Sequence, residues 1–563
     1  MTEDRRNFIL FAVLAALILL GWQVVVDKVL PPAAPPATVI VDAKSKPVAN
    51  PSADPTADSP AATRSRAAVL AETPRIRIDT PALAGSINLK GARLDDLVLK
   101  RHKESLKADS PPIRLLSPAG APGAYFAQLG WRGGPAPDAI WRASGTVLAP
   151  GKPVTLDAAN ATGQRFRIVL AVDNDYMFTI RQTVLNASTG AVSVAPFGLV
   201  NRSGAFEEPD YWTMHAGPMW AGGGKANYGP DFDDLNDGAS NFRSTGGWLG
   251  FTDKFWLTAL VPDQRQAFDG QFRVGPNKAY QADFAMQERL LPAGQMLTTT
   301  SRLFAGAKEV AVLDRYADAG VAPQLDYAID WGWFRIVEKP IFYYLDWLFR
   351  LVGNFGVAII LLTVTIRLLM YPIANKQFAS MAAMRIVQPK MKAIQDRHKD
   401  DKEKMQREVM ALYKTEGVNP LAGCLPVVLQ IPIFYALYKV LMLTIEMRHQ
   451  PFIAWLKDLS APDPLTPINL FGILPFDPPS FLHLGVLAIL LGVTMWLQFK
   501  LNPAATDPTT QQVMMLMPWV MMFIFAPLAA GLQLYYVASN IISIGQQKLL
   551  YMRYPAMSSG TAK

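Results

Sequence analysis

Apolar runs long enough to cross a membrane occur near the start of the chain and again after residue 353. The first run, Phe8–Val26, has 19 residues. That length matches the ~20 residues needed to span a bilayer and exceeds the usual ~7–15-residue apolar part of a signal peptide. We interpret it as an uncleaved signal anchor. The later runs are Gly353–Ala374, Asn419–Ile445, Phe481–Phe499 and Val513–Gly545.

The last of these runs is too long for one span. Its 33 uncharged residues would form a helix of ~50 Å, against a hydrocarbon core of ~30 Å. Pro527 and Gly531 are expected to break it into a short helix at 513–527 and a second helix at 529–547. The sequence therefore predicts six spans and a polytopic α-helical membrane protein.

The middle of the chain follows the two-residue period of β-strands. Apolar and polar residues alternate in Arg75–Asp79, Ser86–Lys90 and Arg165–Ile168, and segments rich in Gly, Pro, Asn and Asp separate them. This pattern predicts a large all-β sandwich at 71–330. The preceding segment 27–70, rich in Pro, Ala, Ser and Asp, is typical of a disordered linker.

An amphipathic helix is expected at 331–352, between the sandwich and the second span. Its aromatic residues Tyr343, Tyr344 and Trp347 are of the types favoured at a membrane–water interface. An ordinary core helix of the sandwich is the alternative. Because the helix directly precedes a predicted span, we favour an interfacial helix.

The loop at 375–418 is strongly basic and has a helical pattern. Apolar positions recur at intervals of three and four residues before and after Asp400-Asp401, which predicts an antiparallel helical hairpin. Its basic surface suits anionic lipid, ribosomal RNA or an acidic polypeptide, although the positive-inside rule alone would explain the charge. We expect a docking surface formed by Arg385, Lys390, Lys392, Arg397, Lys399, Lys402, Lys404 and Arg407.

Charge also sets the expected orientation. The 375–418 loop holds ten Lys or Arg residues and the 446–480 loop holds two, so the basic loop is predicted to be cytoplasmic. Both chain ends are then cytoplasmic, and residues 27–352 lie on the outer side of the membrane. A chain that is 50% hydrophobic and 18% charged fits this mixed architecture, and one cysteine excludes an intramolecular disulfide.

One charge falls within the predicted spans where lipid is expected. Arg367 lies in Gly353–Ala374, and such a charge costs about 2.5–3.5 kcal/mol at the bilayer centre. No Asp or Glu occurs in any predicted span, so we expect a water-lined groove open to the cytoplasm. Snorkelling of Arg367 to the headgroups is the alternative. Uncharged polar and aromatic candidates for the groove are Thr363, Gln430, Gln533, Tyr535, Tyr536, Ser539, Asn540 and Ser543. Helix interruptions around it are expected at Pro426, Pro432, Pro518 and Pro527.

Several of these segments resemble the YidC-type membrane-protein insertases, which belong with the Oxa and Alb insertases. The matching segments are TVTIRLLMYPIANKQFASMAAMRIVQPKM, MALYKTEGVNPLAGCLPVVLQIPIFYALYKVL, DPTTQQVMMLMP and GLQLYYVASNIISIGQQ. The match covers roughly 335–553, and the anchor followed by a large outer domain resembles the Gram-negative branch over the full chain.

The resemblance implies a five-helix insertase core with a hydrophilic groove, a cytoplasmic hairpin and a periplasmic β-supersandwich in the bacterial inner membrane. Arg367 matches the family's groove arginine, and Thr363, Gln430 and Tyr536 match its groove lining. The implied activity is non-enzymatic insertion and folding of inner-membrane proteins, alone or with the Sec translocon. Nascent clients, Sec components, anionic lipid and, through the hairpin, the ribosome are the expected partners. No DNA, metal, cofactor or catalytic residue is expected.

The predicted organisation assigns each residue range a part. The ranges are 1–26 cytoplasmic end and anchor, 27–70 linker, 71–330 sandwich, 331–352 interfacial helix, 353–374 span 2, 375–418 hairpin, 419–445 span 3, 446–480 periplasmic loop, 481–499 span 4, 500–512 cytoplasmic loop, 513–527 span 5, 529–547 span 6 and 548–563 tail.

Two other classes of protein are alternatives to an insertase. A secondary transporter predicts inverted repeats and paired ionisable residues near the midplane, but Arg367 and the near-terminal Lys439 are the only charges in the spans. A membrane-anchored glycan-binding or carbohydrate-active protein predicts a carboxylate pair in an aromatic cleft of the sandwich. It would leave the groove unexplained.

Overall fold

The computed structural model of the chain describes residues 64–204, 214–398, 401–417, 425–471, 474, 484–501 and 508–553. These residues belong to two compact units, a β-rich unit that extends to Asp330 and includes Leu443–Ile445, and a helical unit that begins at Trp331. The predicted anchor at 8–26 and most of the predicted linker lie outside the described residues.

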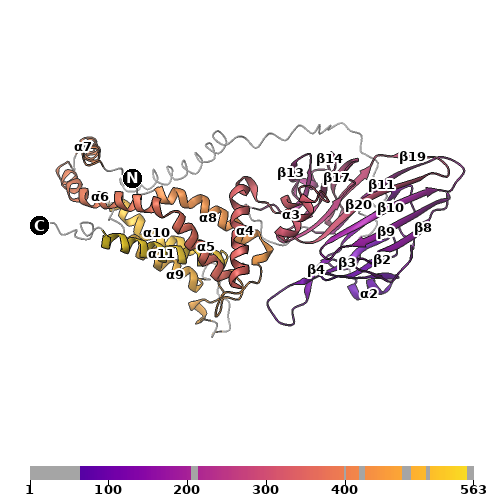
Figure 1. The fold of residues 1–563 in the computed structure, drawn as a ribbon, viewed down its shortest axis with the longest axis horizontal. Helices are drawn as coiled ribbons and strands as arrows, with labels where there is room; N and C mark the ends of the chain where they lie inside the picture. Colours follow the sequence, from indigo (N-terminus) through magenta and orange to yellow (C-terminus); the bar gives the residue numbers. More distant parts are fainter. Residues whose placement is uncertain are drawn as a thin grey trace. The chain divides into compact units, whose positions relative to one another are not determined.

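Two sheets form the β-rich unit (Figure 1). The first sheet contains, in spatial order, β14 (Ser240–Thr245), β17 (Ala267–Gly275), β18 (Ala279–Met286), β11 (Val192–Ser203), β5 (Tyr125–Arg132), β3 (Arg93–Lys103), β2 (Leu83–Asn88), β1 (Arg75–Asp79) and β7 (Val147–Leu148), with β19 (Arg289–Leu291) beside β11 and β4 (Pro112–Leu116) beside β3. The second contains β13 (Lys225–Tyr228), β12 (Gly217–Gly222), β15 (Trp248–Thr252), β16 (Trp256–Val261), β20 (Met296–Ala307), β10 (Met177–Asn186), β9 (Gln164–Val172), β8 (Val154–Ala159) and β6 (Arg142–Ala143). The helices α2 (Arg66–Ala71) and α3 (Val310–Asp318) complete this unit.

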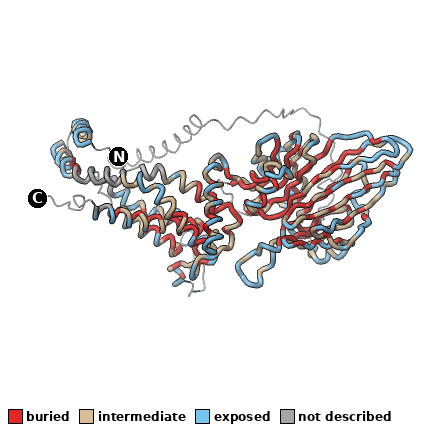
Figure 2. Tube along the Cα trace, viewed as in Figure 1, coloured by how far each residue is buried: buried red, intermediate tan, exposed pale blue. Residues whose placement is uncertain are grey.

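Buried residues run along the strands of the β-rich unit (Figure 2). In β9, Phe166 and Ile168 are buried while Arg165 and Arg167 are exposed. The Phe166 ring lies 5.1 Å from the ring of Trp131 on β5, so this contact joins the two sheets. The predicted all-β sandwich is confirmed, because a strand with one buried face requires this two-residue period.

The sandwich begins earlier than the sequence predicts. Helix α2 begins at Arg66, within the range 27–70 that is predicted to be a disordered linker, and ends at Ala71. Ser65 Oγ accepts a hydrogen bond from the backbone N–H of Ala68, and Val69 is buried. Arg66 pairs with Asp96 of β3. This short helix is therefore stabilised by capping and by contact with the sheet, neither of which a composition count can detect.

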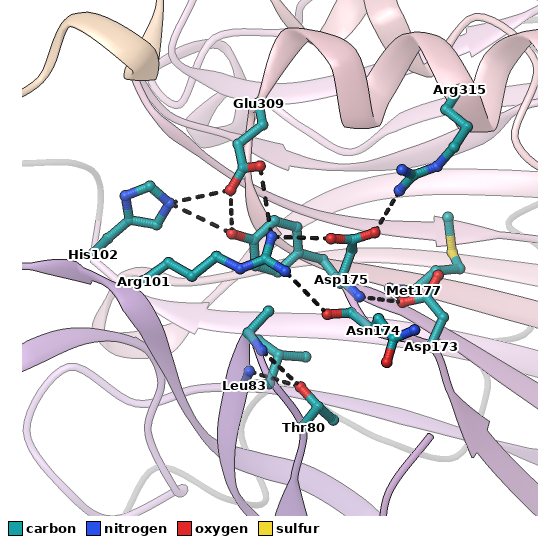
Figure 3. A network of polar contacts seen from close by, with 12 residues as sticks. Thr80, Leu83, Arg101, His102, Asp173, Asn174, Asp175, Met177, Glu309 and Arg315 are labelled. Atoms are coloured by element: carbon teal, nitrogen blue, oxygen red, sulfur yellow. Dashed lines mark hydrogen bonds and ion pairs between the residues drawn. The ribbon is translucent and has the colours of Figure 1, made fainter. Parts of the chain in front are cut away.

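A polar network holds α3 against the sandwich (Figure 3). Glu309, just before α3, accepts a hydrogen bond from the Tyr176 hydroxyl, and His102 Nε2 lies 3.3 Å from the same carboxylate oxygen. Arg101 Nη1 lies 3.0 Å from Asp175 Oδ1 and 3.7 Å from Glu309 Oε2. Further contacts join Arg315 to Asp175 and Tyr316 to Asp173. Side chains from β3, from the segment before β10 and from α3 therefore meet in one cluster.

Burial and charge act in opposite directions on the carboxyl group of Glu309. Burial alone would raise its pKa, but the contacts with His102, Tyr176 and Arg101 outweigh burial and lower it. The same cluster raises the pKa of the Tyr176 hydroxyl, through burial first and the adjacent Glu309 carboxylate second. The network is therefore built around a charged Glu309.

The helical unit consists of short and medium-length helices. They are α4 (Arg335–Val352), α5 (Phe355–Leu369), α6 (Tyr371–Arg397), α7 (Lys402–Thr415), α8 (Leu425–Leu443), α9 (Val486–Leu501), α10 (Pro508–Phe525) and α11 (Ala530–Arg553). Gly353, with φ of 70°, ends α4, and the Asn354 side chain caps α5 by accepting from the Val357 N–H at 3.0 Å.

Several helix ends differ from the expected ones. Helix α6 begins at Tyr371, inside the range 353–374 predicted for span 2, and α10 begins at Pro508, inside the range 500–512 predicted for a cytoplasmic loop. The chain does break at Pro527, between α10 and α11, but α8 and α10 continue through Pro432 and Pro518. A proline removes only one backbone hydrogen bond, so a helix can continue through it when its neighbours keep helical dihedrals.

None of the helices in the described ranges is both long and apolar enough to qualify as a candidate membrane span. The six spans stay a prediction.

Candidate substrate groove and flanking surfaces

Arg367 lies in the last turn of α5 and points to α11. Its Nε lies 3.0 Å from Ser539 Oγ, and its Nη2 donates to the same oxygen. Among the described residues, no Asp or Glu pairs with Arg367. A cation at the C-terminal end of a helix is favoured by the helix dipole. The structure thus places the predicted groove arginine against a neutral hydroxyl group of another helix.

Three further predicted residues lie in contacts between α11 and neighbouring helices: Gln430, Tyr535 and Tyr536. Gln430 of α8 donates from Nε2 to Tyr535 Oη at 2.7 Å. The Tyr536 ring packs edge-on against Phe434 of α8, at 5.5 Å between centroids, and against Phe525 of α10, at 4.7 Å. Tyr535 and Tyr536 therefore connect α11 to both helices, one through a hydrogen bond and the other through ring packing.

Thr363 and Gln533 use their polar atoms on backbone groups. Thr363 is buried one turn before Arg367, and its hydroxyl donates to the Ile359 carbonyl at 2.7 Å. Gln533 Nε2 donates to the Phe525 carbonyl at 3.0 Å and to the Leu528 carbonyl at 2.8 Å. The Phe525 carbonyl also accepts from the Leu528 N–H at 3.0 Å, in the turn that follows the end of α10. The structure does not bring Gln533 to Arg367. The roles of Thr363 and Gln533 in binding a client stay predictions.

Helix α11 carries a continuous line of buried polar residues. Tyr535, Ser539, Ser543 and Gln547 follow one another at four-residue spacing and are each at most 3% exposed. Residues four apart share one face of a helix, so this spacing could have been found in the sequence. On the neighbouring face, Asn540 donates from Nδ2 to Thr494 Oγ1 of α9 at 3.1 Å.

This arrangement supplies hydrogen-bond donors and acceptors from several helices. Side chains of α11 reach α5, α8 and α9, and Gln533 reaches the end of α10. Within the described residues there is no group of three or more His, Cys, Asp or Glu placed to hold a metal ion. A cation among hydroxyl, phenol and amide groups can hold polar or anionic groups of another molecule without forming a covalent bond.

The predicted hairpin segment contains α6 and α7, which contact each other. His398 Nε2 lies 3.1 Å from Glu408 Oε2, and the Tyr413 hydroxyl lies 2.8 Å from Met391 Sδ. Of the basic residues, Lys390 pairs with Glu416 and Arg407 with Glu403. The exposed residues are Lys390, Lys392, Arg397, Lys404 and Arg407. Lys399 and the side chains of Arg385 and Lys402 lie outside the described parts.

Exposed aromatic residues line one side of α4. Tyr343 is 43% exposed and Trp347 is 55% exposed. Tyr344 stacks on Trp347 at 5.7 Å, and its hydroxyl lies 2.9 Å from Thr365 Oγ1 of α5. The helix is therefore attached to α5 while it exposes large aromatic groups, as an interfacial helix would.

Comparison with known proteins identifies the family. Residues 75–344 match the family model of the YidC periplasmic domain, and residues 347–557 match that of the 60Kd inner membrane protein. The membrane protein insertase YidC of Zymomonas mobilis is 50% identical over 98% of this chain and 96% of its own length, and that of Methylobacterium radiotolerans is 43% identical over the same shares.

Among solved structures, that of an active YidC insertase with its first transmembrane domain resolved is 18% identical and covers 86% of this chain and 93% of its own. Its TM-score is 0.37. The two sequence relatives and the two family models suffice, and the chain belongs to the YidC family of membrane protein insertases.

Proposed function

We propose that this protein inserts and folds inner-membrane proteins by holding polar parts of a client at Arg367, in a hydrophilic groove open to the cytoplasm. The family is one of non-enzymatic insertases of the inner membrane with a periplasmic domain. The observation that carries the proposal is the contact of Arg367 with the polar line of α11 at Ser539. The cation is held there by a hydroxyl group and not by a carboxylate.

The proposed topology has six spans, with both chain ends in the cytoplasm and residues 27–352 in the periplasm. It is supported by the ten basic residues at 375–418 against two at 446–480. In this topology the cytoplasmic side of span 2 carries Arg367, and a client would enter from that side.

The proposed mechanism uses binding and release without nucleotide chemistry. A polar group moved into lipid without partners costs several kcal/mol. Arg367 and the α11 residues Tyr535 and Ser539 would offset part of this cost while the polar flank of a client crosses. Burial of the client's apolar segment in lipid, at ~25 cal/mol per Å², would then drive its lateral release.

The proposed partners follow from the two flanking surfaces. The exposed basic residues of α6 and α7, including Lys392 and Lys404, suit anionic lipid headgroups and ribosomal RNA. The aromatic side of α4, with Tyr343 and Trp347, suits the membrane interface. Cooperation with the Sec translocon is proposed from family membership.

The test replaces the native protein with variants in cells and follows two-span clients. Arg367→Ala should impair clients with acidic periplasmic segments more than clients whose translocated segment is uncharged. Arg367→Lys should retain activity, since the role needs a positive charge and not a bidentate fork. Arg350→Ala, which removes an exposed guanidinium from α4, serves as the matched control and should behave as wild type.

Two results would contradict the proposal. Normal insertion of the acidic clients after depletion of the protein would show that another component inserts them. Equal loss in Arg367→Ala and Arg367→Lys, for both classes of client, would show that Arg367 acts in helix packing.

A further inference from the structure

We infer that Ser539 is a positioning residue, which keeps the Arg367 cation at the α5–α11 contact where an acidic side chain of a client can reach it. This inference rests on the proposed function and adds a residue to it. Arg367 Nε and Nη2 both donate to Ser539 Oγ. These two nitrogens form one edge of the guanidinium group, so Ser539 restrains the direction of the whole plane.

The position of Arg367 on α5 makes such a restraint necessary. The residue lies in the last turn of its helix, and a long basic side chain near a helix end can extend to the headgroups. The Ser539 hydroxyl, only 1% exposed on α11, offers a buried alternative. A guanidinium bound there stays one helical turn from Tyr535, which accepts a hydrogen bond from Gln430.

The chemistry of the group that binds Arg367 decides whether the guanidinium can still bind a client carboxylate. A carboxylate would neutralise Arg367 and compete with a client carboxylate, whereas a hydroxyl accepts hydrogen bonds and leaves the positive charge in place. Ser539 occupies the edge formed by Nε and Nη2, so among the described residues Nη1 and its two N–H donors are left for a ligand. The ligand class is an Asp or Glu side chain in the translocated segment of a client.

Neighbouring residues of α11 provide a matched comparison. Ser543 is equally buried, has the same side chain and lies one turn farther along α11. Its hydroxyl donates to the Ser539 carbonyl at 2.9 Å, within its own helix. Ser543→Ala therefore removes a buried serine hydroxyl from α11 without removing the acceptor of Arg367.

The experiment measures insertion of paired two-span clients that differ only in an acidic or an uncharged periplasmic segment. Ser539→Ala should lower the insertion of the acidic client about three- to tenfold, the range expected for one interhelical hydrogen bond in a membrane. The uncharged client should be unaffected. Ser539→Thr, which keeps the hydroxyl, should restore insertion, and Ser543→Ala, which leaves the acceptor of Arg367 in place, should lower insertion of the acidic client less than Ser539→Ala does. The amount of each variant in the membrane is measured alongside.

Each outcome decides between the inference and its alternatives. Equal loss for both clients, or no rescue by Ser539→Thr, would show that Ser539 only packs α11. Wild-type insertion by Ser539→Ala in cells where Arg367→Ala is impaired would overturn the inference and leave the proposed function intact. Wild-type insertion by Arg367→Ala as well would overturn both. In the Arg367→Ala background, Ser539→Ala should add no further loss, and an additive loss would count against the inference.

Discussion

Replacing Glu309 by Gln should loosen α3 from the sandwich. The carboxylate accepts from the Tyr176 hydroxyl and lies 3.3 Å from His102 Nε2, and its side chain is only 23% exposed. Hydrogen bonds to a charged group contribute about 1.5–3 kcal/mol each. Glutamine keeps one carbonyl acceptor but loses the charge, so we expect a loss of about 2 kcal/mol in the free energy of opening α3.

The effect should depend on pH in a stated direction. The pKa of Glu309 in the folded protein is below its ordinary value of 4.5, because the contacts with His102, Tyr176 and Arg101 favour the carboxylate more than burial disfavours it. The carboxylate therefore adds stability that is fully present above pH 4.5 and is lost as the pH falls through the folded pKa. The difference between wild type and Glu309→Gln should shrink over that acidic window.

Hydrogen exchange of the full-length protein in detergent measures this opening directly. Peptides covering α3 should exchange faster in Glu309→Gln at pH 7, after correction for intrinsic rates, while those from β9 and β10 change less. Glu288→Gln, at an exposed position between β18 and β19, is the control. Unchanged protection of α3, or a difference from wild type that persists at the acid limit, would refute the assignment of Glu309 as the centre of the network.

Two other substitutions test single contacts. Tyr535→Phe removes the acceptor of Gln430 Nε2 at 2.7 Å and should lower stability in detergent by about 1 kcal/mol; an unchanged melting temperature would contradict the contact. Arg75→Met leaves the buried Asp95 carboxylate without its charged partner, which should cost about 3–5 kcal/mol in urea unfolding followed by tryptophan fluorescence, and adding Asp95→Leu should recover most of the loss. Equal stability of the single and double variants would contradict this reasoning.

The sandwich could be predicted from the sequence, but its strand order could not. A strand such as β9 can be predicted from its local sequence, since its exposed arginines alternate with buried apolar residues. The pairing of strands depends on contacts between distant segments. Strand β1 pairs in parallel with β7, with Arg77 opposite Val147, and β11 lies between β18 and β5. No local period encodes such partners, because many registers satisfy the same alternation of buried and exposed residues.

The groove residues show the same division between local and distant information. Arg367 stands out in the sequence because it is charged in an apolar run, but its partner on α11 lies 172 residues away. Ser539 and Ser543 carry the same side chain one turn apart, and only the packing of α5 against α11 selects the first. The predicted groove lining by Gln533 depended on polarity alone, whereas the end of α10 supplies the carbonyls that its amide binds.

The proposed function requires that the group bound to Arg367 be uncharged. A buried carboxylate would neutralise the cation, and removing either member would then leave the other charge uncompensated. A hydroxyl group on α11 restrains the guanidinium without neutralising it. The α11 line from Tyr535 to Gln547 extends the same chemistry along the helix with uncharged groups. In the proposed mechanism, a site that binds clients of many sequences and then releases them needs such weak, replaceable contacts around one persistent charge, and the contact of Arg367 with Ser539 is of that kind.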